Sequence, residues 1–431
     1  MNEQFLNSQV VLATSKGNHE LVKGHPIFFL KSQKTIHLFE EPTQFINDEF
    51  VTSGYSQSIH TWSAAAQALK GWFEFLQELK IDWELANRET RLDYKHAYQL
   101  AISPQTGEKY QSETISNRMI IIRQFYKYAE MKGWYSGSLG ADDIQNSKLV
   151  KVNTPIESDM LAHTRQAGGF IKHRDKDLPK RSKRDVIHPL TQHDLKRLHH
   201  YAGPMASQPG TDTRPSRNRL FIDLALYTCA RLNELNSLKT LHFLNLHVSD
   251  EELFFDFPIH LIRKGGNKGL LTCPGWLVRD AQAYIDGERA EAIKAGNGNE
   301  KFATKNLFVG MNTSSRAGRP LTNRALEQQM QKICLEADIV EYKEIVNIET
   351  GELVVIKVAK HSPHDLRHTG IVLIYYTERL RGNTSPWKKC QLKAGHSKLQ
   401  TTLDTYLTHV ETWDRDGGNS LDIMKAIGIR R

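Results

Sequence analysis

The residues of this sequence that could do chemistry together lie mostly in its second half. Arg231, His364, Arg367, His396 and Tyr406 follow in that order, each in a local context suited to one phosphate group. Guanidinium groups neutralise the charge of a phosphodiester, which otherwise repels nucleophiles. A phenol, with an ordinary pKa of about 10, can then attack phosphorus if a neighbouring group takes its proton. The set predicts metal-free cleavage of a phosphodiester by a tyrosine.

A helix start is predicted just ahead of two of these residues. Ser362 is a good N-cap and Pro363 suits the first helical position. His364, Arg367 and His368 then share one helical face, where exposed amides and the helix dipole attract an anion. An ordinary surface helix with satisfied histidines is one alternative. A zinc site, without a well-spaced carboxylate or thiolate, is the other, with ligands His361, His364 and His368.

The last motif predicts a turn followed by a helix. Gly395 can end one helix, and Ser397 with Gln400 forms a capping-box pattern that starts the next. His396 then lies in the turn, and Tyr406 lies about two to three turns along the helix. A single tyrosine on a helix usually packs or faces solvent, but its place after an anion-binding face favours chemistry.

Arg231 has a carboxylate three residues on. The block T-C-A-R-L-N-E-L at 228–235 puts Arg231 and Glu234 at i and i+3 of an apolar helix, where the carboxylate could hold the arginine. The alternative is a surface ion pair worth a few tenths of a kcal/mol.

These three blocks, in this order, resemble the tyrosine recombinase (phage integrase) family. The family's patterns resemble T-x-x-R-x-x-E-L, H-D-L-R-H-T and G-H-S…T-T-x-x-T-Y. The resemblance is close over 190–410 and looser over 51–135, which is similar to the family's helical core-binding domain. A strand-rich stretch at 338–360 and the first fifty residues depart from the pattern.

The resemblance implies a role for each matching residue. The phosphate pocket would consist of Arg231, Arg367, His364 and His396. Tyr406 would be the nucleophile and form a 3′-phosphotyrosyl bond, leaving a free 5′-hydroxyl. His364 is also the candidate base for the phenol. Glu234 would orient Arg231, and His368 would support the site without being a catalyst.

The family's general acid is a lysine in a hairpin. Strand-like runs at 253–255 and 270–272 flank the turn-rich K-G-G-N-K at 264–268, so Lys264 is the best match and Lys268 its rival. A plain surface lysine is the alternative. A second hairpin is predicted around 350–351, between runs at 345–346 and 354–356.

A basic run lies in the stretch at 136–188, which lacks helical periodicity. It is either a solvated linker or a segment that follows a sugar-phosphate backbone. In the second case the DNA contacts would be Lys172, Arg174, Lys180, Arg181, Lys183 and Arg184.

The chain is too long for one compact core, and its patterns predict a mainly α fold with a small β-sheet. Apolar stripes at 69–76 and 115–129 predict two amphipathic helices, the second stopped by Gly133. The expected parts are an N-terminal extension of unknown role (1–50), a helical core DNA-binding domain (51–135), the basic linker (136–188), an α+β catalytic domain (189–412) and a C-terminal tail (413–431). The resemblance implies a C-shaped clamp of two domains around DNA.

Composition narrows the setting. A net charge of +8 favours polyanionic partners. Four cysteines without C-x-x-C spacing suggest neither disulfides nor a metal site, and a reducing cytoplasm fits. There is no apolar run long enough to span a membrane, and the N-terminus lacks a signal-peptide pattern. The sequence contains no Walker pattern, which would indicate ATP use, so no cofactor is expected.

The expected function is therefore site-specific DNA recombination: integration, excision or transposition of a mobile element in a bacterial or phage setting, near the nucleoid. Double-stranded DNA, a DNA-bound homotetramer and possible accessory recombination proteins would be the partners. The apolar tail residues at 421–427 could pack on a neighbouring subunit or on their own core. A type IB topoisomerase-like activity and a catalytically inactive DNA-binding regulator are the alternatives.

Overall fold

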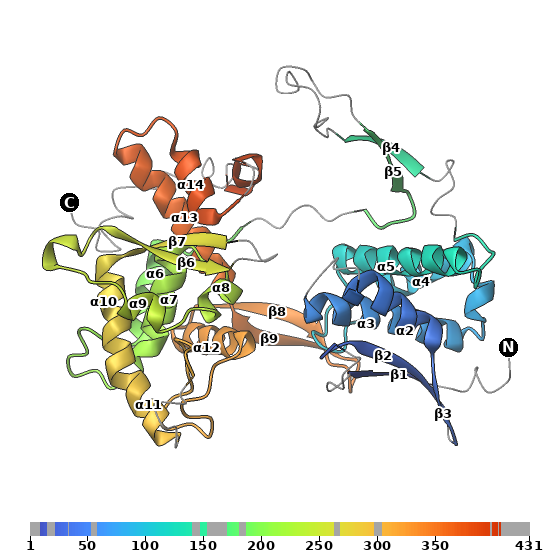
Figure 1. Ribbon diagram of the computed structural model, residues 1–431, viewed down its shortest axis with the longest axis horizontal. Helices are drawn as coiled ribbons and strands as arrows, with labels where there is room; N and C mark the ends of the chain where they lie inside the picture. The colour runs from blue at the N-terminus through green and yellow to red at the C-terminus, as the bar shows by residue number, and fades with distance from the viewer. Residues whose placement is uncertain are drawn as a thin grey trace. The chain divides into compact units, whose positions relative to one another are not determined.

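The chain folds into two compact units in the computed structural model. The N-terminal unit contains residues 1–184 and 345–354, and the C-terminal unit contains residues 185–344 and 355–431. Helices predominate, with two- and three-stranded sheets beside them (Figure 1), so the expected mainly α fold with small sheets is confirmed. The expected clamp stays a prediction. The structure describes residues 9–14, 22–32, 34–52, 58–139, 147–152, 170–180, 187–262, 268–296, 304–396, 399–403 and 405–406.

The described residues among the first fifty, where the sequence predicted no role, build part of the N-terminal unit. Their antiparallel strands are β1 (Gln9–Thr14), β2 (Pro26–Lys31) and β3 (Ile36–Leu38), in the order β1-β2-β3. Helix α2 (Glu40–Ile46) and the π-helical turn η1 (Asn47–Thr52) follow. Phe28, Phe39 and Phe45 are buried in the same apolar core as the helices that come next.

The helices of this unit carry the predicted apolar stripes. They are α3 (Ile59–Glu78), the short 3-10 helix η2 (Trp83–Leu85), α4 (Arg88–Leu100) and α5 (Ser112–Met131). Leu69, Trp72, Phe73 and Leu76 of α3 are all buried, which confirms the first stripe. The second stripe is buried along α5, which ends just before Gly133 at a φ of 72°.

Aromatic side chains join these helices. Phe125 of α5 packs edge-on against Phe73 of α3, with ring centroids 5.5 Å apart. Trp72 Nε1 donates a hydrogen bond to Tyr126 Oη at 3.1 Å, and that hydroxyl donates to the Trp83 carbonyl oxygen at 2.8 Å. The buried polar atoms of these large side chains are thus paired, as a stable aromatic core requires.

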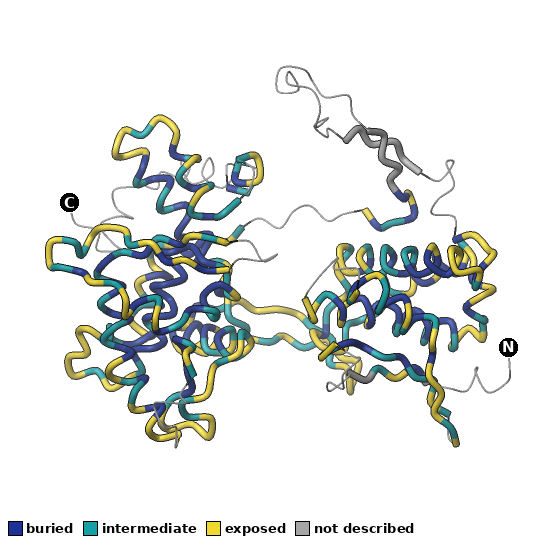
Figure 2. Tube along the Cα trace, in the orientation of Figure 1, coloured by how far each residue is buried: buried dark blue, intermediate teal, exposed yellow. Residues whose placement is uncertain are grey.

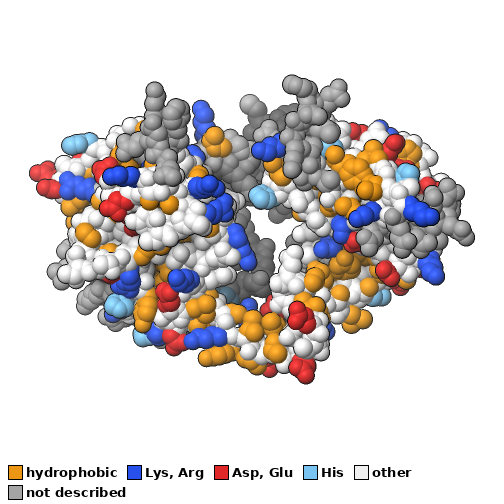
Figure 3. Space-filling model, turned by 90° about the horizontal axis from the view of Figure 1, so that it is seen from below, with side chains coloured by type: hydrophobic (Ala, Val, Ile, Leu, Met, Phe, Trp, Pro, Cys, Tyr) orange, Lys and Arg blue, Asp and Glu red, His pale blue; other side chains and the backbone are white. Residues whose placement is uncertain are grey.

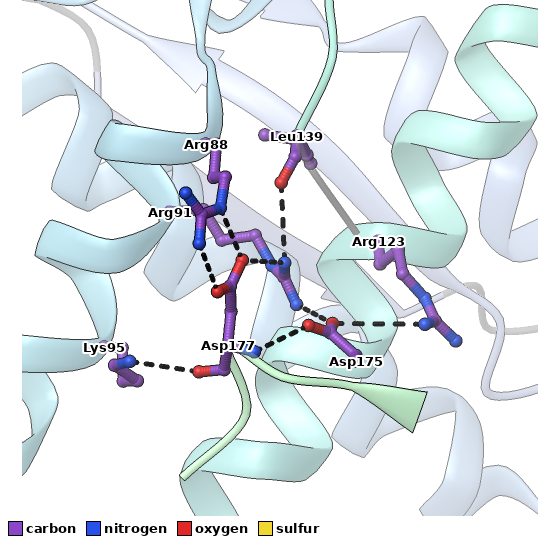
Figure 4. Close-up of polar contacts among 7 residues, drawn as sticks. All are labelled: Arg88, Arg91, Lys95, Arg123, Leu139, Asp175 and Asp177. Atoms are coloured by element: carbon purple, nitrogen blue, oxygen red, sulfur yellow. Dashed lines mark hydrogen bonds and ion pairs between the residues drawn. The ribbon is translucent and has the colours of Figure 1, made fainter. Parts of the chain in front are cut away.

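Part of the expected linker is attached to the N-terminal unit by charge. Strands β4 (Ser147–Val152) and β5 (Phe170–Asp175) form an antiparallel pair. At the end of β5, Asp175 pairs with the fully buried Arg91 of α4 (Figure 4). Arg88 binds Asp177 through two nitrogens, at 2.8 and 3.0 Å. Two buried carboxylates therefore hold residues 175–177 against α4.

The C-terminal unit is built around one buried helix. Its elements up to residue 336 are α6 (Gln192–Ala202), α7 (Ser216–Thr228), α8 (Leu232–Asn236), α9 (Leu241–Leu244), η4 (Asp250–Glu252), β6 (Asp256–Ile262), β7 (Lys268–Pro274), α10 (Gly275–Tyr284), η5 (Ile285–Arg289), α11 (Ala290–Ala295) and α12 (Asn323–Glu336). From residue 363 onward, it contains α13 (Pro363–Leu380) and α14 (Pro386–Ala394), followed by helical residues 399–403 and 405–406. Helix α7 contacts α6, α8, α10, α13 and β7. It is buried along most of its length (Figure 2), so it fixes the elements on both sides of it.

The hairpin predicted near 264–268 is confirmed, with one correction to its first strand. Strands β6 and β7 pair antiparallel, with Ile259 opposite Leu271. The strand starts at Asp256, whereas a strand-like run was predicted at 253–255. There the chain is still turning, because Phe255 N–H donates to the Glu252 carbonyl oxygen at 3.0 Å. Phe254 is 86% exposed, so its strand propensity is outweighed by local turn geometry.

The hairpin predicted around residues 350–351 is also confirmed. Strands β8 (Val340–Val346) and β9 (Leu353–Ala359) form a two-stranded sheet. Gly351 has a φ of 74° in the turn between them. Among the described residues, no helix is long and apolar enough to cross a membrane.

Candidate active site

Arg231 begins a helix, and this corrects the expected arrangement. The sequence predicted Arg231 inside one apolar helix, but α7 ends at Thr228, and Cys229 takes a left-handed conformation with a φ of 53°. The Thr228 hydroxyl donates to the Leu224 carbonyl oxygen and accepts from Ala230 N–H at 3.3 Å. These bonds stabilise the break, so that Arg231 precedes the first turn of α8.

Glu234 holds Arg231 from two sides. The Arg231 backbone N–H donates to Glu234 Oε2 at 2.9 Å, and its guanidinium donates to Oε1 at 3.2 Å. The Glu234 side chain is only 4% exposed, whereas that of Arg231 is 36% exposed. The carboxylate is thus placed to orient the arginine while leaving part of its guanidinium accessible.

The start of α13 is as the sequence predicted. Ser362 N–H donates to Asp365 Oδ2 at 2.8 Å, and Ser362 Oγ accepts from His364 N–H at 3.3 Å, with Pro363 at the first position. His364 is exposed in this first turn, and its ring packs edge-on against His368, with centroids 4.5 Å apart. Desolvation by neighbouring atoms, and then the charge of Arg367, lowers the pKa of His364.

Arg367 is buried and joins three helices. Its guanidinium donates to the carbonyl oxygens of Cys229, after α7, and Ala394, at the end of α14. Burial, and then the charge of Arg231, lowers the pKa of Arg367. Two mutually repelling guanidiniums in one region form a site that an anion would stabilise.

His396 lies in the turn after α14, as predicted. Gly395 ends the helix at a φ of 61°, and His396 Nδ1 lies 2.9 Å from the hydroxyl of the fully buried Thr402. Burial, followed by the charges of Arg367 and Arg231, lowers the pKa of His396 to about 4. The imidazole is therefore neutral at neutral pH. The predicted cap at Ser397 lies outside the described residues.

Tyr406 is buried in the same region. Its side chain belongs to the same buried apolar cluster as Cys229, Tyr375 and Cys390, and the residue is 1% exposed. Its hydroxyl lies 2.8 Å from His368 Nδ1. Burial raises the pKa of Tyr406, and the charges of Arg367 and then Arg231 act in the opposite direction.

The predicted set is thus largely brought together. Arg231 and Arg367 both interact electrostatically with three other residues of the set, namely His364, His396 and Tyr406. The sequence did not predict that Thr402 would hydrogen-bond to His396, although Thr402 belongs to the T-T pair of the last motif. The T-T pair was the signal that could have identified it.

The predicted lysines and linker residues are only partly covered by the described residues. Lys264 is outside the described residues, and Lys268 is exposed at the start of β7. The backbones of Lys172 and Arg174 lie in β5, but their side chains are outside the description. Lys180 is exposed. The remaining linker residues, Arg181, Lys183 and Arg184, are outside the described part.

Metal ligands are not grouped in the part of the chain that the structure describes: it holds no cluster of three or more His, Cys, Asp or Glu that could bind an ion. His361, one of the possible zinc ligands, is buried, with Nε2 3.3 Å from Asp194 Oδ2. The described site therefore offers cationic and neutral hydrogen-bonding groups with a phenol, which suits an anionic ester.

The comparisons with known proteins give only remote structural likenesses. No family model and no curated protein matches the chain. A XerH site-specific recombinase bound to palindromic difH substrate, in a post-cleavage complex, is 14% identical at a TM-score of 0.49, covering 84% of this chain and 80% of that one. The Tn1549 transposon integrase (aa 82-397) in complex with circular intermediate DNA is 14% identical at 0.44, covering 84% and 94%. A lambda integrase dimer bound to a COC' core site is 13% identical at 0.43, covering 85% and 76%.

Proposed function

We propose that this chain is a tyrosine-type site-specific DNA recombinase. It would cut and rejoin DNA through a 3′-phosphotyrosyl intermediate, during integration, excision or transposition of a mobile element. The observation that carries the proposal is the buried Tyr406 phenol, which interacts electrostatically with both Arg367 and Arg231. A phenol beside two guanidiniums is suited to attack a phosphodiester that those guanidiniums bind.

The two arginines would act in different ways on the phosphate. Arg367, fixed by the carbonyl oxygens of Cys229 and Ala394, would supply charge from a rigid position. Arg231, more exposed and oriented by Glu234, would reach the non-bridging oxygens. His364 and the neutral His396 would complete the pocket, because a neutral imidazole can donate one hydrogen bond to an anion. Electrostatic stabilisation of this kind needs no metal.

The reaction is balanced by two proton transfers. Tyr406 Oη forms a bond to phosphorus and gives its proton to a neighbouring imidazole, while the bond from phosphorus to the 5′-oxygen breaks. The leaving oxygen needs a proton, which Lys264 or its rival Lys268 would provide. The ester energy is kept in the phosphotyrosyl bond, so a new 5′-hydroxyl can reverse the step without ATP.

Double-stranded DNA would be the partner, bound as a tetrameric complex with possible accessory proteins. The net charge of +8 favours a polyanion. On the face drawn in Figure 3, basic side chains are interspersed with acidic ones on both units. Lys172, Arg174, Lys180, Arg181, Lys183 and Arg184 would add phosphate contacts, making binding steeply dependent on salt.

A pool of nicked duplexes with randomised sequence around the nick tests the proposal, because the chain itself selects its target sequence from the pool. Loss of the short strand after cleavage would trap a covalent adduct that survives detergent. We expect the wild-type chain to enrich one family of sequences in that adduct and Tyr406→Phe to give none. Failure of the wild-type chain to form any adduct, while it still selects a sequence by binding, would favour the regulator. Adducts without sequence preference would favour a topoisomerase-like activity.

A further inference from the structure

We infer that His368, rather than His364, takes the proton from Tyr406 when the phenol attacks phosphorus. This inference rests on the proposed function and assigns a chemical step to a residue that the sequence reading regarded as a support. His368 Nδ1 lies 2.8 Å from the Tyr406 hydroxyl, and both side chains are buried.

The position of His368 on α13 explains the contact. His364 and His368 are four residues apart, so they lie on the same face, one turn from each other. His364 is in the exposed first turn, whereas His368 is 8% exposed and faces the cluster that contains Tyr406. A proton acceptor must be within hydrogen-bond reach of the proton that it takes, and His368 meets this condition.

The proposed transfer requires the phenol to be the donor in this hydrogen bond. His368 Nδ1 must then be unprotonated, so the ring proton of the neutral imidazole would be on Nε2. Burial raises the pKa of Tyr406, so the phenol does not ionise by itself near neutral pH. An imidazole is a common proton acceptor in catalysis near neutral pH.

The step is reversible and complete in its atoms. In cleavage, the oxygen of Tyr406 bonds to phosphorus, its proton moves to His368 Nδ1, and the 5′-oxygen leaves with a proton from the general acid. In rejoining, the imidazolium of His368 returns its proton to the departing phenolate as a 5′-hydroxyl attacks. One imidazole thus serves both directions without an additional reactant.

Two substitutions separate proton transfer from positioning. His368→Asn puts an amide oxygen near the place of Nδ1, where it can accept the hydrogen bond but cannot hold the proton at neutral pH. His368→Ala removes both functions. Each is measured in single-turnover cleavage of the duplex that the wild-type chain selects, with DNA affinity as the test of folding. His193→Ala, at an exposed position on α6, is the matched control.

We expect both His368 variants to bind DNA like the wild type and to cleave about 10²- to 10⁴-fold more slowly. A duplex with sulfur in place of the bridging 5′-oxygen provides the second readout, because its thiolate leaves without a proton. That duplex should restore cleavage by a Lys264→Ala variant but leave both His368 variants slow.

Three results would overturn the inference while leaving the proposed function intact, provided that the wild-type chain forms its covalent adduct with DNA. They are cleavage by His368→Asn at the wild-type rate, faster cleavage by either variant, or recovery of both on the sulfur duplex. The first would make His368 a positioning residue, the second a restraint on Tyr406, and the third a group acting on the leaving oxygen. If the wild-type chain forms no adduct at all, the proposed function itself fails.

Discussion

Arg367 donates a hydrogen bond to the backbone carbonyl oxygen of Cys229, the residue whose left-handed conformation separates α7 from α8. The same break brings Arg231 to the start of α8. One arginine therefore binds the backbone turn that positions the other. Because the second carbonyl that Arg367 contacts belongs to Ala394, just before the turn with His396, the guanidinium links three parts of the site.

Arg367→Lys is expected to damage both stability and catalysis. A lysine has a single nitrogen on a flexible chain and cannot bind two carbonyl oxygens in the fixed geometry of a guanidinium. Loss of one buried, charged hydrogen bond should lower the free energy of unfolding by about 1.5–3 kcal/mol. Urea denaturation measures this change, and Arg324→Lys, at an exposed position of α12, is the control. Equal midpoints for the two variants would contradict the role given to Arg367.

Gly370→Ala tests the close packing of α13 on α7. A methyl group at this position would overlap the Leu226 carbonyl oxygen and lie 2.8 Å from Cys229 Sγ. Overpacking of this kind costs about 1–3 kcal/mol, and a shift of α13 would also displace Arg367. We expect a lower denaturation midpoint together with slower adduct formation. Gln328→Ala, exposed on α12, should change the free energy of unfolding by less than about 0.5 kcal/mol. A variant as stable as the wild type would show that the two helices separate without cost.

Thr402→Val should slow cleavage without unfolding the chain. Valine keeps the shape of threonine but cannot form the 2.9 Å hydrogen bond with His396 Nδ1, so the imidazole loses its fixed orientation. We expect about a 10-fold slower single-turnover rate, comparable to the effect of losing an orienting partner of a functional histidine. Thr402→Ser retains the hydroxyl and is the matched control. Similar rates for valine and serine would exclude this role.

The neutral state of His396 should affect how the free energy of unfolding depends on pH. Its pKa is lowered to about 4, so the unfolded chain, with an ordinary histidine pKa of about 6.5, binds the proton first as pH falls. The contribution of His396 to stability is therefore present above about pH 6.5 and is lost between 6.5 and 4. Urea midpoints should fall less steeply over that window in His396→Asn than in the wild type. Parallel curves would contradict the lowered pKa.

Asp177→Asn should loosen the attachment of residues 175–177 to the N-terminal unit. Burial alone would raise the pKa of Asp177, but its bonds with Arg88 outweigh this and hold the pKa low. Asp177 is buried but Arg88 is 42% exposed, so losing this charged hydrogen bond should cost about 1.5–3 kcal/mol. Thermal unfolding at neutral pH measures the loss. The exposed Asp250→Asn, which also pairs with an arginine, should have little effect.

The pH dependence of the effect of Asp177→Asn gives a second check on the pair of Asp177 and Arg88. A lowered carboxyl pKa stabilises the fold above the ordinary aspartate pKa of about 3.9, and this contribution is lost as pH falls through the lowered value. The difference between wild type and Asp177→Asn should therefore shrink in acid. A difference that stays constant down to the acid transition would show that the carboxylate charge is not what stabilises the segment.

Features that depend on neighbouring residues were predictable from the sequence. The N-cap at Ser362, the stripe on α3 and the stop at Gly133 follow from local hydrogen bonding and helical periodicity, and the structure has all three. The two hairpins were located by their turn residues. The predicted start of the first hairpin strand was wrong, because a turn after Glu252 outweighs the strand propensity of two phenylalanines.

Features that depend on distant partners were not predictable. His368 and Tyr406 are 38 residues apart in the sequence, and Arg91 and Asp175 are 84 apart, so no local sequence pattern predicts either contact. From the sequence, His368 was predicted to support the site, and residues 136–188 were predicted to be a basic linker. The break at Cys229 was missed because the apolar pattern continues through it, while the hydroxyl of Thr228 stabilises the turn.

The most direct test of the central claim is to map the covalent bond. The adduct formed on a nicked duplex would be digested with trypsin and nuclease, and the modified peptide sequenced by mass spectrometry. We expect one nucleotide, joined through its 3′-phosphate, on the peptide that carries Tyr406, and no such peptide from Tyr406→Phe. A nucleotide on any other residue, or an adduct that persists in the phenylalanine variant, would contradict the assignment of Tyr406 as the nucleophile.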